Sequence, residues 1–209
     1  MVSVLKKMCF TGVLLLCGCA TMNKSECLTA DWRMIGLEDG AIGRELAYIG
    51  NHRKACADHN VSPDLEQYQI GYSQGLQKYC TYTEGYQLGK GGRGYKSVCP
   101  SELEEDFLVG YQRGRNIYTL TQEINRTNSS IKSAFKLLEE LEDEILHKEA
   151  LLISKETPLA ERILLLVEIK DIHKEISGLE MEISLLEEQK EDQINEQRML
   201  VKQYQDGPG

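Results

Sequence analysis

The stretch that decides the fold is residues 117–152, IYTLTQEINRTNSSIKSAFKLLEELEDEILHKEALL. Isoleucine or leucine returns at every seventh position of this stretch, beginning with Ile117, and a smaller set follows at an offset of three. The two sets are Ile117, Ile124, Ile131, Leu138, Ile145 and Leu152, and Leu120, Thr127, Ala134 and Leu141. Because a heptad repeat places both sets along one side of a helix, the stretch predicts one long helix with a coiled-coil seam.

A second apolar seam follows after a short break at residues 154–158. The break ends in Thr157 and Pro158, which suit the cap and the first position of a new helix. The second seam consists of Leu165, Ile169, Ile172, Ile176, Leu179, Ile183 and Leu186. Two seams joined by a short turn predict an antiparallel coiled-coil hairpin over residues 115–206. The alternative is one continuous helix, kinked at Pro158 and assembled with other chains, but a proline inside a helix costs about 3 kcal/mol.

Further leucine and isoleucine residues lie beside the two seams near the turn and widen the apolar surface there. They are Leu151 and Ile153 before the break and Leu164 and Leu166 after it. A contiguous exposed apolar patch is typical of a surface that binds another protein. These four residues are therefore the candidates for partner binding. The alternative is that they bury against the arms of the hairpin itself.

Glycine and tyrosine are concentrated in the segment that precedes the hairpin, residues 19–114. Two glycines four residues apart recur there as Gly36 with Gly40, Gly71 with Gly75, Gly85 with Gly89, and Gly110 with Gly114. Glycines at this spacing share one helix face and allow a second backbone to approach closely. The segment therefore predicts short packed helices near residues 31–48, 64–81, 82–90 and from 102 onward. The irregular intervals between the glycine pairs argue against a solenoid.

The start of the chain has the pattern of a secretory signal peptide. Lys6 and Lys7 precede an apolar run, residues 8–16, which is too short to span a membrane as a helix. The run ends in Leu16-Cys17-Gly18-Cys19, which resembles a bacterial lipobox.

This resemblance implies a lipoprotein signal peptide at residues 1–18, cleavage after Gly18 and a diacylglycerol on Cys19. Two acyl chains are enough for stable anchoring to a membrane. Ala20 stands where retention in the inner membrane is associated with aspartate, so the resemblance implies delivery to the outer membrane, facing the periplasm. The alternative is an ordinary cleaved signal peptide, with Cys19 free or disulfide-bonded.

Four cysteines remain beyond Cys19, namely Cys27, Cys56, Cys80 and Cys99. An even number of cysteines in an exported domain indicates disulfides, although three pairings are possible and the sequence does not choose among them. The last 110 residues contain no cysteine. We therefore expect an all-α chain in which a disulfide-braced helical domain, residues 19–114, is followed by the hairpin, residues 115–206.

An ordered set of residues runs through the cysteine-containing domain. It consists of Cys27, Trp32, Ile35-Gly36, Asp39-Gly40, Gly43, Cys56, Tyr68, Gly71-Tyr72, Gly75 and Tyr79-Cys80. This set resembles an uncharacterised family of bacterial lipoproteins that is known only as a domain of unknown function. The resemblance covers about residues 25–115. It implies an envelope compartment and a helical fold, and it brings no activity.

Few features of the sequence point to chemistry. The formal net charge is −9, and the absence of a basic patch excludes nucleic acid as an expected partner. His52, Cys56 and His59 have a spacing that could hold zinc on one helix face, but Cys56 is needed to make the cysteine count even. A metal site or enzyme built on these three residues is therefore the weakest alternative. Asp39 is expected to bond a nearby backbone group.

The sequence thus predicts a non-enzymatic, lipid-anchored envelope protein that needs no cofactor. The hairpin is expected to reach a protein partner in the periplasm. The alternative is a structural homo-oligomer in which the hairpins of different chains pair with one another.

Overall fold

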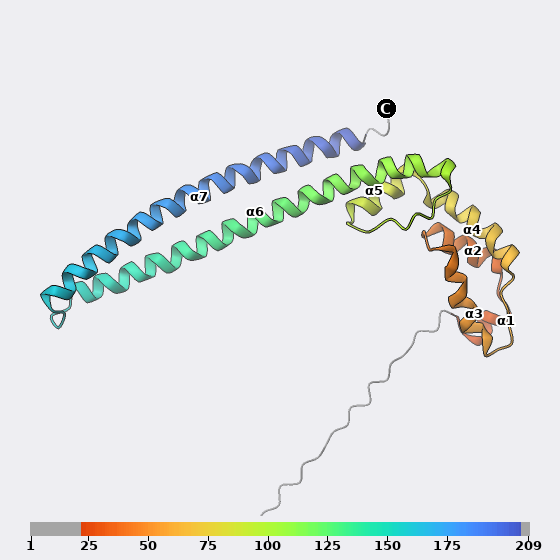
Figure 1. Cartoon of the computed structure of the whole chain (residues 1–209), viewed down its shortest axis with the longest axis horizontal. Helices are drawn as coiled ribbons and strands as arrows, with labels where there is room; N and C mark the ends of the chain where they lie inside the picture. Colours follow the sequence, from red (N-terminus) through yellow and green to blue (C-terminus); the bar gives the residue numbers. More distant parts are fainter. Residues whose placement is uncertain (1–21, 206–209) are drawn as a thin grey trace, which may run out of the picture. The chain divides into compact units, whose positions relative to one another are not determined.

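The computed structural model describes residues 22–205, and all of its regular structure is helical (Figure 1). The elements are α1 (Lys24–Leu28), α2 (Trp32–Ala41), the 3-10 helix η1 (Leu46–Tyr48), α3 (Ile49–Ala57), α4 (Leu65–Tyr79), α5 (Tyr82–Lys90), α6 (Ser101–Ile153) and α7 (Leu159–Gln205). The predicted all-α class is therefore confirmed for this range. No helix within it is long and apolar enough to cross a membrane. The predicted signal peptide and Cys19 lie outside the described residues.

The described residues form two compact units, the first ending at Tyr79 and the second beginning at Cys80. The boundary that the sequence predicted at residue 114 falls inside α6, which is one unbroken helix. This difference has a physical reason, because the first turns of α6 pack against α5 while its later turns pack against α7. One helix therefore serves both the cysteine-containing region and the hairpin.

The first unit is built on the close packing of α2 against α4. A Cβ atom on Gly36 would meet the backbone of Tyr68 and Tyr72, and one on Gly71 would meet the backbone of Arg33 and Leu37. Backbones can approach this closely only where both helices lack side chains at the contact. The prediction that paired glycines bring two helices together is thus confirmed, and the structure adds which helices they join.

The second unit repeats this arrangement in α5 and α6. A Cβ atom on Gly85 would meet the backbone of Phe107 and Tyr111, in positions that correspond to Tyr68 and Tyr72 of the first unit. The hydrogen bonds correspond as well, because the hydroxyl of Tyr72 donates to the carbonyl oxygen of Arg44 and that of Tyr111 donates to the carbonyl oxygen of Arg93.

The turn that follows the first helix is also the same in both units. Gly43 and Gly92 have left-handed backbones, with φ of 67° and 69°, and a Cβ on either would meet the ring of Tyr79 or Tyr118, respectively. The two units therefore contain copies of one helix pair. Irregular spacing along the chain concealed this repeat, because η1 and α3 separate the helices of the first pair only.

The region between α2 and α4 differs from the prediction of one helix over residues 31–48. Helix α2 ends at Ala41, because the left-handed turn at Gly43 reverses the chain. The chain then forms η1 and α3, and neither α3 nor the short α1 was predicted. Apart from Ile49, the residues of α3 are small or polar, so the sequence offers little apolar pattern from which to predict a helix.

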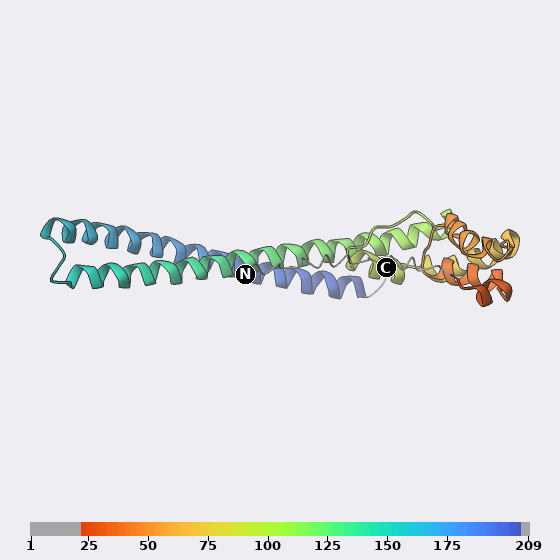
Figure 2. The same ribbon diagram turned by 90° about the horizontal axis from the view of Figure 1, so that it is seen from below.

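The hairpin consists of α6 and α7, which run antiparallel and side by side (Figures 1 and 2). Its apolar core is formed by seam residues of both helices, namely Ala134, Leu141, Ile145, Ile172, Leu179 and Ile183. Nearer the open end the seam also contains a polar pair, in which the hydroxyl of Thr127 donates to Oε1 of Gln193 over 3.0 Å. The predicted helical seams therefore meet each other within one chain.

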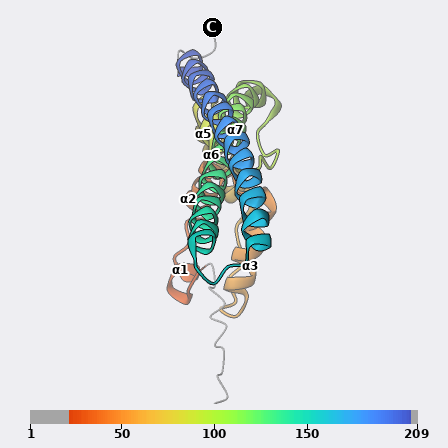
Figure 3. The ribbon, with the colours of Figure 1, turned by 90° about the vertical axis from the view of Figure 1, so that its left-hand side faces the viewer.

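The turn of the hairpin, seen end-on in Figure 3, is held by polar contacts to carbonyl oxygens. Nη2 of Arg162 donates to the carbonyl oxygen of Ser154 over 2.6 Å, and Nε donates to that of Thr157 over 3.0 Å. The hydroxyl of Thr157 donates to the carbonyl oxygen of Leu151. Thr157 was predicted to cap the second helix, and its side chain instead satisfies a carbonyl at the end of the first.

Candidate functional site

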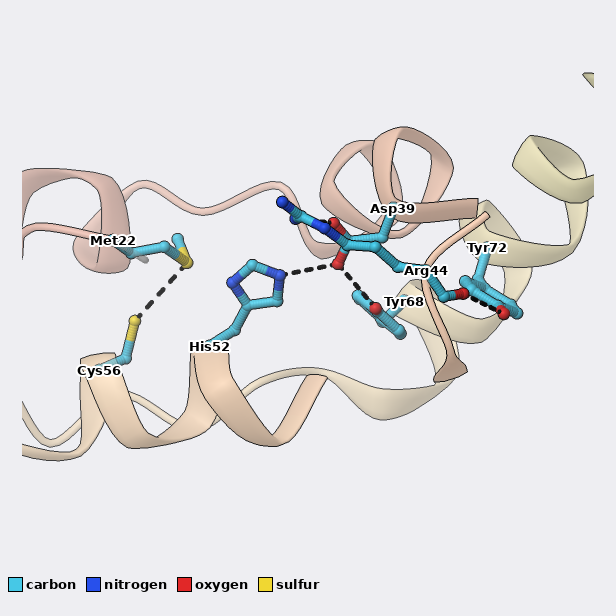
Figure 4. A network of polar contacts seen from close by, with 7 residues as sticks. All are labelled: Met22, Asp39, Arg44, His52, Cys56, Tyr68 and Tyr72. Carbon is cyan, nitrogen blue, oxygen red and sulfur yellow. Dashed lines mark hydrogen bonds and ion pairs between the residues drawn. The ribbon is translucent and has the colours of Figure 1, made fainter. Parts of the chain in front are cut away.

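A buried polar network surrounds Asp39, on the packed face of α2 (Figure 4). The carboxylate is only 2% exposed. Its Oδ2 accepts hydrogen bonds from the hydroxyl of Tyr68 over 2.8 Å and from Nε2 of His52 over 2.7 Å. Its Oδ1 accepts a hydrogen bond from Nη1 of Arg44 over 2.6 Å. Three side chains from different parts of the first unit therefore meet at the carboxylate of Asp39.

Each partner of Asp39 is brought to it by a local feature of the fold. The turn at Gly43 brings Arg44 back, and the amide of Arg44 also donates to the carbonyl oxygen of Asp39 over 3.0 Å. His52 lies on α3, one turn before Cys56, whose disulfide to Cys27 joins α3 to α1. Tyr68 lies on α4 at the point where Gly36 allows the two helices to touch.

The network keeps Asp39 ionised. Burial by itself raises the pKa of this carboxyl, but the hydrogen bonds from His52, Tyr68 and Arg44 together outweigh burial and hold the pKa below its ordinary value. Burial and the neighbouring Asp39 charge raise the pKa of Tyr68, so its phenol stays protonated and acts as a donor. Since an ionised carboxylate has no proton to give, Nε2 of His52 must carry the proton that the two groups share.

A cavity of about 400 Å³ opens beside this network. Asp39, Arg44 and His52 line it, together with Met22 and Glu38 among others. Sδ of Met22 lies 3.9 Å from Sγ of Cys56, a van der Waals contact because a disulfide sulfur has no proton to donate (Figure 4). The site therefore combines a charged network, an apolar wall and open volume.

The second unit has no counterpart of this network in its helix pair. Leu88 stands at the position of Asp39, and Phe107 at the position of Tyr68. Tyr95 packs on Phe107 with 4.7 Å between ring centroids. The same helix pair thus forms around apolar side chains, so the fold itself does not require a buried ionic network. Since buried charges are costly to desolvate, the packing of the helix pair alone does not explain the network.

The structure joins the four cysteines as Cys27 with Cys56 and Cys80 with Cys99. Each bridge connects the segment before the first helix of a pair to the segment before the second. The expected disulfides are therefore confirmed, and the pairing that the sequence left open is settled.

The zinc alternative built on His52, Cys56 and His59 does not have the groups that it needs. Cys56 is in a disulfide and offers no thiolate, and Nε2 of His52 is committed to Asp39. Over residues 22–205, no three His, Cys, Asp or Glu side chains are placed so that they could hold a metal ion.

The four candidates for partner binding lie near the turn of the hairpin, and all are exposed. Ile153 is 80% exposed and Leu164 is 62% exposed, whereas Leu166 is 54% and Leu151 is 38% exposed. The neighbouring seam residue Leu165 is buried, at 6% exposed. These side chains therefore do not bury against the hairpin, which was the alternative.

Sequence reasoning missed the network around Asp39. We expected Asp39 to bond a backbone group, whereas its side chain is buried and bonded to the buried side chain of His52. A usable signal was present, because Asp39 stands directly before Gly40 and three residues after Gly36. That spacing places the carboxylate near the packed face of the helix.

One of three comparisons with known proteins gave a match, and it covers part of the chain. A comparison with curated proteins found no match, and a comparison with solved structures found none either. The family described as "Protein of unknown function (DUF2799)" matches residues 31–116. The match contains both glycine-paired helix pairs and ends within α6, before most of the hairpin. Residues 31–116 thus match a domain of unknown function, and the rest of the hairpin lies outside that match.

Proposed function

We propose that this chain is a non-enzymatic lipoprotein of the bacterial envelope, anchored through Cys19, whose hairpin binds a protein partner at its turn. The observation that carries the proposal is the gathering of exposed apolar side chains around the turn. Eight large ones lie between residues 146 and 167, namely Leu146, Leu151, Ile153, Leu159, Ile163, Leu164, Leu166 and Val167. We call this surface the apex patch.

The composition of the apex patch supports a protein partner. Apolar side chains of this size are costly to leave in water, and exposed apolar residues gathered in one region are typical of interaction sites. Charged residues of both signs lie among them, and Nζ of Lys148 pairs with Glu168 over 2.8 Å. A protein can offer an apolar recess with basic residues at its rim. Residues 115–209 carry a net charge of −8, which favours such a rim.

The cysteines and the start of the chain support the compartment. Two disulfides are expected to persist only in an oxidising compartment such as the periplasm. The lipobox-like Leu16-Cys17-Gly18-Cys19 supplies an acceptor for the lipid. Delivery to the outer membrane, facing the periplasm, belongs to the same proposal.

Site-specific photo-crosslinking in the envelope tests the partner contact. A photoreactive residue placed at Ile153 or Leu164 should give the same single crosslinked protein. Placed at Leu185, which is 61% exposed on α7 and outside the apex patch, it should give no such product. Leu166→Glu should abolish the crosslink from Leu164, because a buried carboxylate without a partner is costly.

The other occupants of the apex patch are distinguishable outcomes. A crosslink between two copies of this chain would replace the proposal with the homo-oligomer. A crosslink to lipid alone, or an equal yield from Leu185, would refute the apex patch as a protein-binding site.

A further inference from the structure

A buried polar atom that the fold leaves without a hydrogen-bond partner lies beside the cavity near Asp39. His52 is 5% exposed, and its Nδ1 is the one buried side-chain nitrogen or oxygen within residues 22–205 that has no hydrogen-bond partner. In Figure 4 this nitrogen lies on the edge of the ring that faces Met22. Met22 and His52 both line the cavity. A buried polar atom without a partner is rare in proteins and calls for an explanation.

The bonding of the imidazole decides what Nδ1 can accept. Its Nε2 donates to the ionised Asp39 carboxylate over 2.7 Å. In the neutral ring the other nitrogen then carries a lone pair, so Nδ1 is a hydrogen-bond acceptor. A group that satisfies it must bring an N–H or O–H donor into the cavity.

The charges around the cavity narrow the class of donor. Glu26, Glu38 and Asp39 contribute three carboxylates to the lining, and Arg44 contributes one guanidinium. Arg44 is already paired with Asp39 over 2.6 Å, so the charge that it brings is compensated. The lining is therefore rich in acceptors and negative on balance, which favours a cation.

The volume and the walls fit a group that is larger than water. The cavity measures about 400 Å³, whereas one water molecule takes up about 30 Å³ of liquid. Met22 and Ile35 provide apolar surface in the same lining. An aliphatic stem could lie against these two side chains while its charged end meets the acceptors.

We propose that this cavity binds a small organic cation whose primary ammonium donates to Nδ1 of His52 and pairs with Glu38. An ammonium has three donors and no acceptor, which matches a lining composed of a lone pair and carboxylates. This site is separate from the apex patch, so either proposal can fail without the other.

The test uses the oxidised, full chain labelled with ¹⁵N-histidine and titrated with butylammonium at neutral pH. The chain has four histidines, and His52→Gln identifies the resonance of His52. We expect a saturable change at Nδ1 of His52 and no change at His147 or His173. Butanol and butyrate, which share the stem but lack the ammonium, should leave Nδ1 unchanged.

Two exposed glutamates provide a matched pair of variants. Glu38→Gln should weaken butylammonium binding by about threefold, the size expected for an exposed ion pair. Glu45→Gln removes the same charge from a residue that does not line the cavity, and it should leave the affinity unchanged. Both glutamates are exposed, so neither substitution is expected to unfold the chain.

Three results would overturn the proposal. The first is the absence of any saturable response at His52, which would mean that only water satisfies Nδ1. The second is an equal response to butanol, which would show that the charge is not recognised. The third is an equal loss of affinity in Glu38→Gln and Glu45→Gln, which would show a general charge effect.

Discussion

The bonding around Asp39 predicts that the effect of Tyr68→Phe on the free energy of unfolding changes sign when Asp39 is replaced by Leu. Asp39→Leu leaves two buried donors without an acceptor, the hydroxyl of Tyr68 and Nε2–H of His52. Each such orphan costs about 1–3 kcal/mol. Arg44 loses its partner too, but its side chain is 37% exposed and regains water. We therefore expect Asp39→Leu to lower the free energy of unfolding by about 3–5 kcal/mol.

Tyr68→Phe should act in opposite directions in the two backgrounds. In the natural chain it removes a hydrogen bond to a charged group and should destabilise by about 1.5–3 kcal/mol. In the Asp39→Leu background it removes a buried hydroxyl that has lost its acceptor, so it should stabilise by about 1–3 kcal/mol. The double variant then has Leu at position 39 and Phe at position 68. The second unit has the same two residue types at the equivalent positions, Leu88 and Phe107.

Urea unfolding of the oxidised chain, followed by tryptophan fluorescence, measures this effect. Trp32 is the only tryptophan, and it is buried on α2 within the first unit. Tyr72→Phe is the control, because the hydroxyl of Tyr72 donates to the carbonyl oxygen of Arg44 and not to Asp39. It should destabilise by about 1 kcal/mol in both backgrounds. If Tyr68→Phe is equally destabilising in both backgrounds, the reasoning about the network is refuted.

Three further predictions concern stability. Because the folded state holds the pKa of Asp39 below its ordinary value, the unfolded state binds more protons in acid. The stability that Asp39 contributes is therefore full above about pH 4 and is lost as the pH falls further. Asp39→Asn should remove this part of the decline when urea midpoints are measured against pH. Gly75→Ala places a Cβ against the α2 backbone and should lower the free energy of unfolding by about 3 kcal/mol or more. Gly50→Ala has open space around the new Cβ and should raise it by about 0.5–1 kcal/mol. A similar effect of both substitutions in thermal unfolding would contradict the close packing of α2 and α4. Replacing Cys80 and Cys99 by Ser opens a loop of 19 residues and should lower the free energy of unfolding of the second unit by about 3 kcal/mol. Unfolding followed by circular dichroism measures this loss. An unchanged free energy would mean that the bridge does not constrain the unfolded chain.

The long helices were predictable because their information is local. A seam that repeats every seven residues predicts a helix without knowledge of its partner, and Pro158 marks the start of the second helix. The glycine pairs likewise predicted close helix contacts. The sequence did not show which helices pair, because η1 and α3 intervene between α2 and α4 while a loop alone joins α5 to α6.

The candidate site was not predictable, because it depends on contacts between distant residues. Asp39 and Tyr68 are 29 residues apart, and each was interpretable alone as a cap or a packing residue. His52 lies on a short helix of mostly small and polar residues, and a disulfide ties that helix to α1. The internal repeat, once seen in three dimensions, is what identifies Asp39 as unusual, since the equivalent position holds Leu88.

The central claim is that a lipid on Cys19 anchors a disulfide-braced domain that carries a helical hairpin. Intact-mass analysis of the exported protein, after alkylation without reductant, tests it most directly. We predict a chain that begins at Cys19, carries a diacylglycerol or a triacyl group, and has no alkylated cysteine. A product without acyl groups and with Cys27, Cys56, Cys80 and Cys99 all alkylated would contradict both the anchor and the oxidised domain.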